Sequence, residues 1–596
     1  MTKLRIYLSR TALILLTLLL AACYDYEQDV TTEEQPVDIL SRFNAEGKAW
    51  LSLNIGLPDN MTRTYFSDGD GIEYAIKTLT LVLFRGESTD TEDELTVASI
   101  YDVSYTPQMD SHQQITHHST TTVQITDRNI RNSDKLYLLT IANASPNISE
   151  GDRFSNVKTL TLSSLTTEIG GPKYFVMTNA PLTSASDGTG SVTALAEIDP
   201  SFFAATEADA LAAPACYVYL ERAAAKVTTK LANGLDMHVK GNMYISFDES
   251  DFQYSLFNYN MTSNLIRQMD ASWLPYYSTT RRFVEQTPLP NLQYCTYWAR
   301  DINYDDVPDY TGMKSWKSMG QSDYCAENTF DVSHMQDNCT TSVLVRLQLN
   351  NGGDFYTTSV TGQDIIFQPP TNDLSEEGTS ASESFVRRRS KVVTYDGSKT
   401  ATIDDYLRTW LMEQSAALRN WVRDYAGNEK KHLKIEVSGN AETGLATATL
   451  SQTAQTSGTG FNKFESLTDA YAETGGVTLK AYLQALLNSL TIKFYDDGYC
   501  YYRVLIRHFD DTQTPWSSAA SMTDNTPAVV YGGDAEKYLG RYGMVRNNWY
   551  NISINSVTHV GSPIIPPLTT NADDKVEQLL NATLHISGWE KHEQNL

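Results

Sequence analysis

The segment from Ala49 to Phe66 combines a strong strand pattern with a single basic residue in the loop that follows it. Four apolar residues alternate with small or polar ones, at the period of a half-buried β-strand: Leu51, Leu53, Ile55 and Leu57. Pro58 ends the pattern, and Arg63 is the only basic residue of the loop. The pattern alone predicts an edge strand. One cut between Arg63 and Thr64 would separate this strand from the rest of the chain.

Length and charge restrict the classes of protein to which the chain can belong. Its 596 residues predict at least two domains, and 41% hydrophobic residues are enough for packed cores. The 72 acidic residues outnumber the 46 basic ones and give a net charge of −26. This excess argues against a nucleic-acid surface, which needs clustered positive charge, and against electrostatic binding to anionic lipid.

Residues 1–23 are predicted to be a lipoprotein signal peptide. Three basic residues precede an apolar run, Thr11–Leu20, that is too short to span a bilayer comfortably. The run ends in Leu-Ala-Ala-Cys, which predicts cleavage between Ala22 and Cys23 and acylation of Cys23 with chains such as palmitate. A plain secretory signal with a chance cysteine is the alternative. Residues 24–48 are acidic and polar and are predicted to be a tether or propeptide.

Five cysteines remain after Cys23, and an odd number cannot all pair within one chain. They are Cys216, Cys295, Cys325, Cys339 and Cys500. One disulfide within the group of Cys295, Cys325 and Cys339 is compatible with an oxidising compartment, and so is a set of buried free thiols.

Two β domains are predicted between the leader and the tail. In the first, residues 64–213, the strongest strand patterns are residues 76–84, 134–143 and 174–181, and the second of these is apolar on both faces, which predicts a central strand. The second domain, residues 214–568, carries long polar loops between residues 256 and 390. Residues 402–427 and 478–490 have the helical period, and Asp496–Gly498 predicts a hairpin turn.

The polar residues predict no catalytic, cofactor or metal site. The histidines at 112, 117 and 118 lack further ligands at a suitable spacing. Arg503, Arg507, His508 and Arg546 are accompanied by neither a nucleophile nor paired carboxylates, so we expect structural salt bridges there. The chain is therefore predicted not to be an enzyme.

The tail, residues 569–596, contains a second alternating strand with Ala582, Leu584 and Ile586. When buried, the four apolar side chains of the first strand contribute on the order of 6–12 kcal/mol. Removing that strand would leave an apolar groove with unpaired strand edges, which another strand can fill. A groove and a donor strand at opposite ends of one chain generate filaments rather than closed rings.

Several motifs resemble those of one family. Strands that end in LVLF, LYLLTIAN and FVMTNAP follow one another as in the N-terminal domain of the Bacteroidetes fimbrillins, the subunits of type V pili. The segment YVYLERAAAKV, Tyr217–Val227, resembles the start of their second domain, with matches at Glu221, Arg222, Ala223 and Lys226. Two later segments resemble the minor-fimbrium branch: the strand that ends at His508, and YGMVRNNWY, Tyr542–Tyr550, in which Asn548 stands where histidine is usual.

The resemblance implies a mainly β fold of two tandem antiparallel, transthyretin-like β-sandwiches, the second with inserted loops and two helices. It also implies a lipid-anchored precursor at the cell outer membrane, cut after Arg63 by an arginine-specific extracellular protease. The vacated place is then filled by the C-terminal strand of the next subunit in an extracellular fimbrium. The implied partners are further copies of the chain, other fimbrial subunits and surface ligands of host or bacterial cells.

Three functions remain open from the sequence. The first is a polymerising stalk subunit that uses both end strands. The second is an accessory, tip or anchor protein of the fimbria, because a tip needs no donor tail and an anchor keeps its lipid. The third is a surface lipoprotein that binds or cleaves glycans, which would need a cleft with paired carboxylates.

Overall fold

The structure is a computed structural model. It describes residues 39–56, 73, 75–105, 118–126, 130–185, 190–238, 246–270, 273, 282–285, 287–349, 352–360, 363–368, 391–393, 400–425, 433–452, 475–509, 538–575 and 579–588. None of the described helices is long and apolar enough to cross a membrane.

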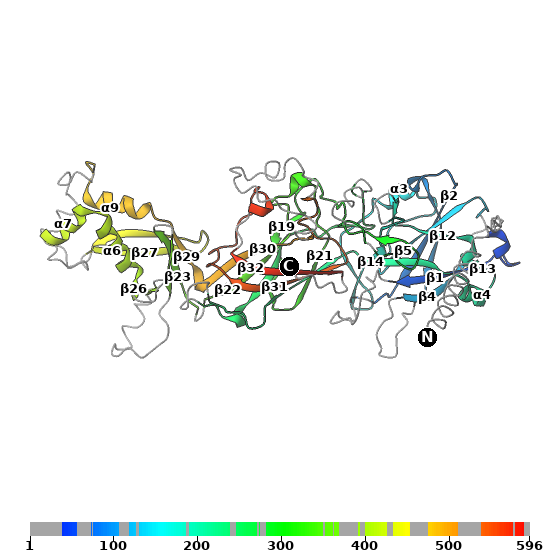
Figure 1. Cartoon of the computed structure of the whole chain (residues 1–596), viewed down its shortest axis with the longest axis horizontal. Helices are drawn as coiled ribbons and strands as arrows, with labels where there is room; N and C mark the ends of the chain where they lie inside the picture. Colours follow the sequence, from blue (N-terminus) through cyan, green and yellow to red (C-terminus); the bar gives the residue numbers. More distant parts are fainter. Residues whose placement is uncertain are drawn as a thin grey trace, which may run out of the picture.

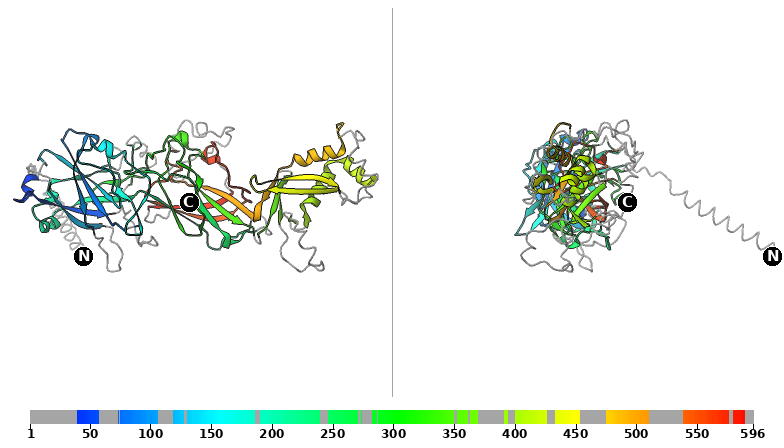
Figure 2. Two further views of the ribbon diagram at one scale, coloured as in Figure 1. Left: turned by 180° about the vertical axis from the view of Figure 1, so that it is seen from behind. Right: turned by 90° about the vertical axis from the view of Figure 1, so that its left-hand side faces the viewer.

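Three β units lie in a row along an elongated molecule (Figure 1). The N-terminal domain occupies one end, the second domain the middle, and a unit inserted into the second domain the other end. The end-on view in Figure 2 shows how narrow this row is across its long axis. The predicted mainly β fold is confirmed.

The N-terminal domain is built from a nine-stranded arrangement that encloses one core and covers a second. Its strands are β1 (Ala49–Gly56), β2 (Leu79–Gly86), β3 (Thr96–Val103), β4 (His118–Ile125), β5 (Lys135–Ala142), β9 (Met177–Asn179), β12 (Ala196–Ile198), β13 (Phe203–Ala204) and β14 (Cys216–Arg222). As predicted, β5 is central: Leu138 points to one core and Leu139 to the other. Short helices α3 (Phe154–Val157) and α4 (Glu207–Ala212) complete the domain.

The second domain is a sandwich of a four-stranded and a five-stranded sheet. The first sheet contains β21 (Ser322–Cys325), β15 (Ala225–Leu231), β31 (Asn548–Val557) and β32 (Leu580–Gly588). The second contains β19 (Tyr310–Met313), β16 (Gln253–Tyr259), β20 (Lys317–Ser318), β22 (Ser342–Gln348) and β30 (Tyr499–Leu505). Val227, Val345 and Tyr502 are among the side chains from both sheets that share one buried core.

The chain passes from the first domain to the second within a few residues. β14 belongs to the sheet of the first domain and β15 to that of the second, so the crossing lies at Ala223 and Ala224, after the predicted boundary at residue 213. Both alanines are fully buried, because the two domains pack closely around this crossing.

The inserted unit has a sheet and a core of its own. Its seven strands, in sheet order, are β26 (Thr400–Thr402), β25 (Lys391–Val393), β24 (Gln363–Gln368), β23 (Phe355–Val360), β29 (Ile492–Tyr495), β28 (Leu445–Gln452) and β27 (Leu433–Asn440). Three helices, α6 (Ile403–Gln414), α7 (Ala416–Tyr425) and α9 (Leu479–Asn488), contribute apolar side chains to this core. The region predicted as loops, residues 256–390, contributes β23 and β24 to this compact α/β unit, and the two segments predicted as helices lie in it as well.

Two local predictions differ from the structure. The first predicted helix is divided at the buried Ser415, whose hydroxyl accepts a hydrogen bond from the backbone N–H of Leu418 (3.0 Å) and so caps a new helix. The turn at Asp496–Gly498 does not form a hairpin, because β29 lies in the sheet of the inserted unit and β30 in the five-stranded sheet. Asp497 and Gly498 have positive φ angles, which turn the chain from one sheet to the other.

The five cysteines after Cys23 are buried free thiols. Cys325 lies in the core of the second domain and Cys339 in a smaller neighbouring cluster, so the predicted group of three does not form a disulfide.

The inserted unit leaves and rejoins the second domain at adjacent positions, because Phe355 pairs with Tyr495 and their rings stack 4.1 Å apart. We predict that a short Gly-Ser linker in place of residues 356–494 leaves the two sandwiches folded. Calorimetry should then show the cooperative transition of the sandwiches retained. Loss of that transition would show that the second domain needs the inserted unit to fold.

Candidate assembly sites at the first and last strands

β1 lies inside a sheet, so the prediction of an edge strand is wrong. It pairs antiparallel with β4 from Ala49 to Gly56 on one side. On the other side its first part pairs with β13 and its second part pairs parallel with β14. Leu51, Leu53 and Ile55 are buried in the core, as their alternation predicts. Removing β1 would therefore open a slot with a strand on each side.

β4 depends on β1 for its place in the domain. Among the described strands, β4 pairs only with β1. Helix α4 packs against both strands, and Thr122 of β4 donates a hydrogen bond to Glu207 of this helix (2.9 Å). Ser52 lies opposite Thr122, so it lies on the face that α4 covers, and only 1% of it is exposed. The β1 position is thus enclosed by β4, β14 and α4.

The apolar side chains give β1 a large share of the domain's stability. Burying Leu51, Leu53 and Ile55 contributes roughly 5–9 kcal/mol at 1.5–3 kcal/mol for each side chain. This range is comparable to the net folding stability of a whole domain. The domain would therefore lose most of its stability if β1 left and nothing replaced it.

The predicted processing residues lie outside the described part of the chain. They are Ala22, Cys23, Leu57, Arg63 and Thr64. The placement of the cleavage loop therefore remains a prediction.

The first described residue after that loop, Glu73, is buried between the two domains. Its carboxylate forms an ion pair with Lys226 (3.0 Å) and accepts a hydrogen bond from the hydroxyl of Tyr324. Its backbone carbonyl accepts a hydrogen bond from Nε of Arg222 (2.8 Å). Nothing in the sequence around Glu73 predicts this role, because its partners lie 149 residues or more further along the chain.

The two motifs that carry the family resemblance contact one another at this junction. Asn547 Oδ1 accepts hydrogen bonds from the backbone N–H of Arg222 (3.1 Å) and from its side chain (3.0 Å). The ammonium of Lys226 lies 4.5 Å from the ring centroid of Trp549. Asn547 has a φ of 61°, a left-handed conformation that asparagine tolerates better than most residues. Residues from both ends of the second domain thus join it to the first.

Arg503, Arg507 and Arg546 form the salt bridges that the sequence predicts, whereas His508 forms hydrogen bonds. Arg546 and Glu327 form a fully buried ion pair (2.7 Å), and Arg503 pairs with Asp337. Arg507 lies 3.9 Å from Asp574. His508 is held between the hydroxyl of Tyr550 (2.8 Å) and the backbone carbonyl of Tyr297 (2.9 Å).

The last strand, β32, lies at the edge of its sheet and pairs only with β31 among the described strands. Leu580 and Leu584 are buried in the core of the second domain, and Ala582 is half-buried. The backbone of Ile586 pairs with Tyr550, while its side chain lies outside the description. The predicted donor strand thus completes its own domain in this structure.

The connection between β31 and β32 is fastened to the domain independently of β32. The hydroxyl of Thr558 donates a hydrogen bond to the carbonyl of Leu579 (2.7 Å), which joins the two ends of this long connection. Asp573 accepts a hydrogen bond from Thr340 (2.8 Å), and Asp574 pairs with Arg541 (2.9 Å). The chain is therefore held firmly up to Asp574, a few residues before β32 begins.

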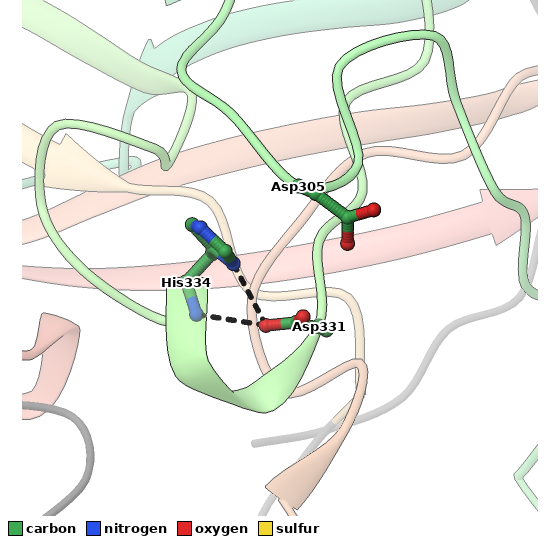
Figure 3. Close-up of side chains that lie close together, drawn as sticks. All are labelled: Asp305, Asp331 and His334. Carbon is green, nitrogen blue, oxygen red and sulfur yellow. Dashed lines mark hydrogen bonds and ion pairs between the residues drawn. The ribbon is translucent and has the colours of Figure 1, made fainter.

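One small cluster in the described residues has the composition of a metal site (Figure 3). Asp331 accepts hydrogen bonds from the backbone N–H (3.0 Å) and the ring (2.8 Å) of His334, and Asp305 lies nearby. Asp305 is exposed and pairs with Arg300 (3.1 Å). The carboxylate of Asp331 caps the turn that contains His334, so turn formation accounts for these contacts.

A comparison with protein families identifies a match in the C-terminal part of the chain. Residues 493–595 match the family described as major fimbrial subunit protein type IV, fimbrillin, C-terminal. This C-terminal part of the chain is similar to the C-terminal domain of the fimbrillins. The matched residues include β30, β31 and β32, and with them one side of the domain junction and the candidate donor strand. The family prediction is confirmed, and the minor-fimbrium branch stays a prediction.

No curated protein matches the chain. Several solved structures with fimbrial descriptions align with it at low sequence identity. A fimbrilin from Porphyromonas gingivalis W83 covers 91% of this chain and 98% of that chain at 14% identity, with a TM-score of 0.35. The alignment with the tip fimbrial protein Mfa3 from Porphyromonas gingivalis, with C-terminal truncation, covers 56% of this chain and 84% of that chain. The identity is 12% and the TM-score is 0.25. The alignment with a fimbrial assembly protein from Parabacteroides distasonis ATCC 8503 covers 53% of this chain and 94% of that chain. The identity is 12% and the TM-score is 0.23. Because these TM-scores are below 0.5, the assignment depends on the family match.

The burial of His508 predicts a loss of stability in acid. Burial lowers the pKa of His508 from its usual 6.5 to about 4. Protonation then favours the unfolded chain, so this contribution is complete above pH 6.5 and is lost as the pH falls towards 4. The loss amounts to about 3 kcal/mol at 1.36 kcal/mol per pKa unit.

Urea unfolding at pH 7 and pH 4 tests this prediction. The drop in unfolding free energy between these pH values should be smaller in the His508→Gln variant than in the native protein by about 3 kcal/mol. Equal drops in unfolding free energy in the two proteins would show that His508 does not cause the loss of stability in acid, since all other groups titrate in both.

Proposed function

We propose that the chain is a structural subunit of a cell-surface fimbria that polymerises by donor-strand exchange and contributes to adhesion. The observation that carries this proposal is the position of β1. It is a core-forming strand enclosed by β4, β14 and α4, and the chain that follows it contains Arg63. Its removal leaves a slot that satisfies a new strand by hydrogen bonds on both sides.

The positions of the two end strands support a filament. β1 lies in the terminal domain of the row and β32 in the middle domain (Figure 1). A strand donated from one surface to a different surface of the next copy is a heterologous contact, which propagates along a line when the rotation does not close. Other copies of the chain and other fimbrial subunits are the partners that this scheme requires.

Export as a lipoprotein supplies the starting state of the scheme. The signal peptide and Cys23 would attach the precursor to the outer membrane, where an arginine-specific extracellular protease would cut after Arg63. The lipid and β1 share the released fragment, so the same cut would free the mature subunit from the membrane. The extracellular fimbrium is then its final location.

A tip subunit is a second candidate, and two observations favour it. β32 contributes Leu580 and Leu584 to its own domain, so the strand already has a place. The inserted unit forms the end of the molecule opposite to the domain of β1 (Figure 1). If a neighbouring subunit fills the slot of β1, this unit faces away from the fibre, where it can contact host or bacterial surface ligands.

The first test concerns the cut itself. Mature protein from assembled fibres should begin at Thr64, and the Arg63→Ala variant should keep Cys23 and form no fibres. N-terminal sequencing and electron microscopy give the two measurements. An Arg42→Ala variant, with the change placed before β1, is the matched control and should form fibres. Fibres whose subunits retain Cys23 would contradict the processing step.

A second test separates the stalk from the tip. Deletion of residues 582–596 should abolish fibres if the chain is a stalk subunit, whereas normal fibres would assign a tip role. Because the deletion also removes the buried Leu584, a covalent lock provides a milder variant. Cysteines in place of Ser553 and Thr583, which are opposite one another on β31 and β32, hold β32 in place when oxidised.

The lock should block fibre formation by a stalk subunit under oxidising conditions and permit it after reduction. Cysteines in place of Glu436 and Thr449, which pair on the exposed face of the β27–β28 hairpin in the inserted unit, are the matched control. This second lock should have no effect on fibre formation in either state.

A further inference from the structure

We infer that the cavity between the second domain and the inserted unit is a binding site for an acidic saccharide. The inference goes beyond the proposed role in assembly and does not depend on strand exchange. The cavity has a volume of about 410 Å³ and is lined by residues of β30, of β29 and of the connection between β31 and β32 (Figure 1). Binding sites for small molecules have volumes of about 300–1,000 Å³, so this cavity has room for a small ligand.

A peptide strand cannot extend the sheet at Tyr501, which lines the cavity. β30 is the last described strand of its sheet, but its outer edge is already paired at this point. The backbone N–H of Tyr501 donates a hydrogen bond to the carbonyl of Ser562 (2.8 Å), and the N–H of Ser562 donates one to the carbonyl of Tyr501 (2.8 Å). The backbone groups that would hold an added strand are therefore occupied, and a ligand of the cavity must be recognised by side chains.

The lining offers flat apolar surfaces to such a ligand. The ring of Tyr501 is half-exposed, and the ring of Trp316 lies next to it, with 6.2 Å between the centroids. Pro563, Pro566 and Pro567 contribute three further rings to the lining. The face of an aromatic ring carries partial negative charge, and the C–H groups of a sugar ring carry partial positive charge, so the two stack favourably.

Positive charge prevails in the cavity, although the whole chain has a net charge of −26. The charged residues of the lining are Lys493, Arg503 and Asp337. Arg503 and Asp337 form a buried ion pair, and Asp337 also accepts hydrogen bonds from the backbone N–H (2.9 Å) and the hydroxyl (2.8 Å) of Thr569. Lys493 is exposed and forms no ion pair within the described part of the chain. Its uncompensated ammonium group favours an anionic ligand.

A second cation without a carboxylate partner lies beside Tyr501. Arg346 is opposite Tyr501 in the ladder of β22 and β30, so both side chains lie on the face of the sheet that points away from the core. Its guanidinium carbon lies 4.7 Å from the ring centroid of Trp316 and 4.5 Å from that of Tyr499, and the group donates a hydrogen bond to Gln253. Among the described residues no carboxylate pairs with Arg346. A carboxylate of a ligand stacked on Tyr501 could fill this place.

An acidic saccharide meets these requirements together. Its C–H faces suit Tyr501 and the proline rings, its hydroxyl groups suit polar side chains such as the amide of Asn571, and its carboxylate suits Lys493 and Arg346. The lining contains one carboxylate, that of Asp337, and this group is engaged by Arg503. Cleavage of a glycosidic bond would need a pair of carboxylates, so the cavity is suited to binding rather than to cleavage.

Titration calorimetry on the full chain, with β1 in place, tests the inference. Digalacturonic acid and the neutral galactose disaccharide of the same linkage share a ring skeleton and differ in the carboxylates. The acidic disaccharide should bind at least about tenfold more tightly, because charge-assisted hydrogen bonds are stronger than neutral ones. N-acetylneuraminic acid serves as a second acidic sugar, and the stronger binder identifies the kind of acid. Inorganic sulfate serves as a simple anion and should bind more weakly than the acidic sugars.

Two variants locate the site. Lys493→Gln should weaken the binding of the acidic sugar at least about tenfold, and Tyr501→Leu should weaken the binding of both disaccharides. Lys230→Gln changes an exposed lysine of β15, in the other sheet, and is the matched control that should bind as the native protein does. The melting temperature of each variant shows whether its fold is intact. Lys493→Gln should still form fibres.

Each contrary outcome overturns a stated part of the inference. Equal binding by the Lys493→Gln and Lys230→Gln variants would exclude this cavity as the site. Equal affinity for the acidic and the neutral disaccharide would exclude the acidic class, and equal affinity for sulfate would leave an anion site without specificity for sugars. If neither acidic sugar binds, the inference fails. None of these results bears on strand exchange, whose failure would instead appear as a loss of fibres in the tests above.

Discussion

The buried charges between the two domains are the constraint on which the rest of the molecule depends. Glu73 contacts Arg222 and Lys226, which lie on either side of the domain crossing. Arg546 and Glu327 form a second buried ion pair close by. A charge buried without its partner costs several kcal/mol, so removing one member of such a pair is strongly destabilising. The domains are therefore held in one relative arrangement, and the chain is fixed at Glu73, the first described residue after β1. A filament made of rigid rods needs such a fixed arrangement in each subunit.

Local pattern was sufficient to predict much of the framework. The alternation of Leu51, Leu53 and Ile55 predicted a core-facing strand, and the segment with Leu138 and Leu139, apolar on both faces, predicted a central one. These patterns report burial, which each strand shows in its own sequence. The neighbours of a strand depend on residues far along the chain, so the interior position of β1 between β4 and β14 could not be predicted from its sequence. For the same reason the edge assignment failed.

The inserted unit and the domain junction were missed for two further reasons. In the strand β28 of the unit, Leu445–Gln452, alanine and leucine alternate with the exposed Thr447 and Thr449, so the apolar contrast of the segment is weak. The turn at Asp497 is compatible with a hairpin, and only the sheet order shows that it joins two units. Glu73 and Glu327 look like solvated surface charges in the sequence, because their basic partners lie more than 140 residues away. For the assembly sites, the last strand could be identified from alternation, but its place in the core of its own domain could not.

The enclosed position of β1 separates cleavage from release. A cut after Arg63 would break one peptide bond, but it would break none of the hydrogen bonds to β4 and β14 and none of the core contacts of Leu51 and Leu53. The severed strand would stay in its slot until another strand displaced it. Proteolysis alone would thus make the subunit competent without exposing its core, and the slow step of growth would be the replacement of one strand by the other. A cut subunit could therefore wait at the cell surface in a folded, non-aggregating form until a growing fibre met it.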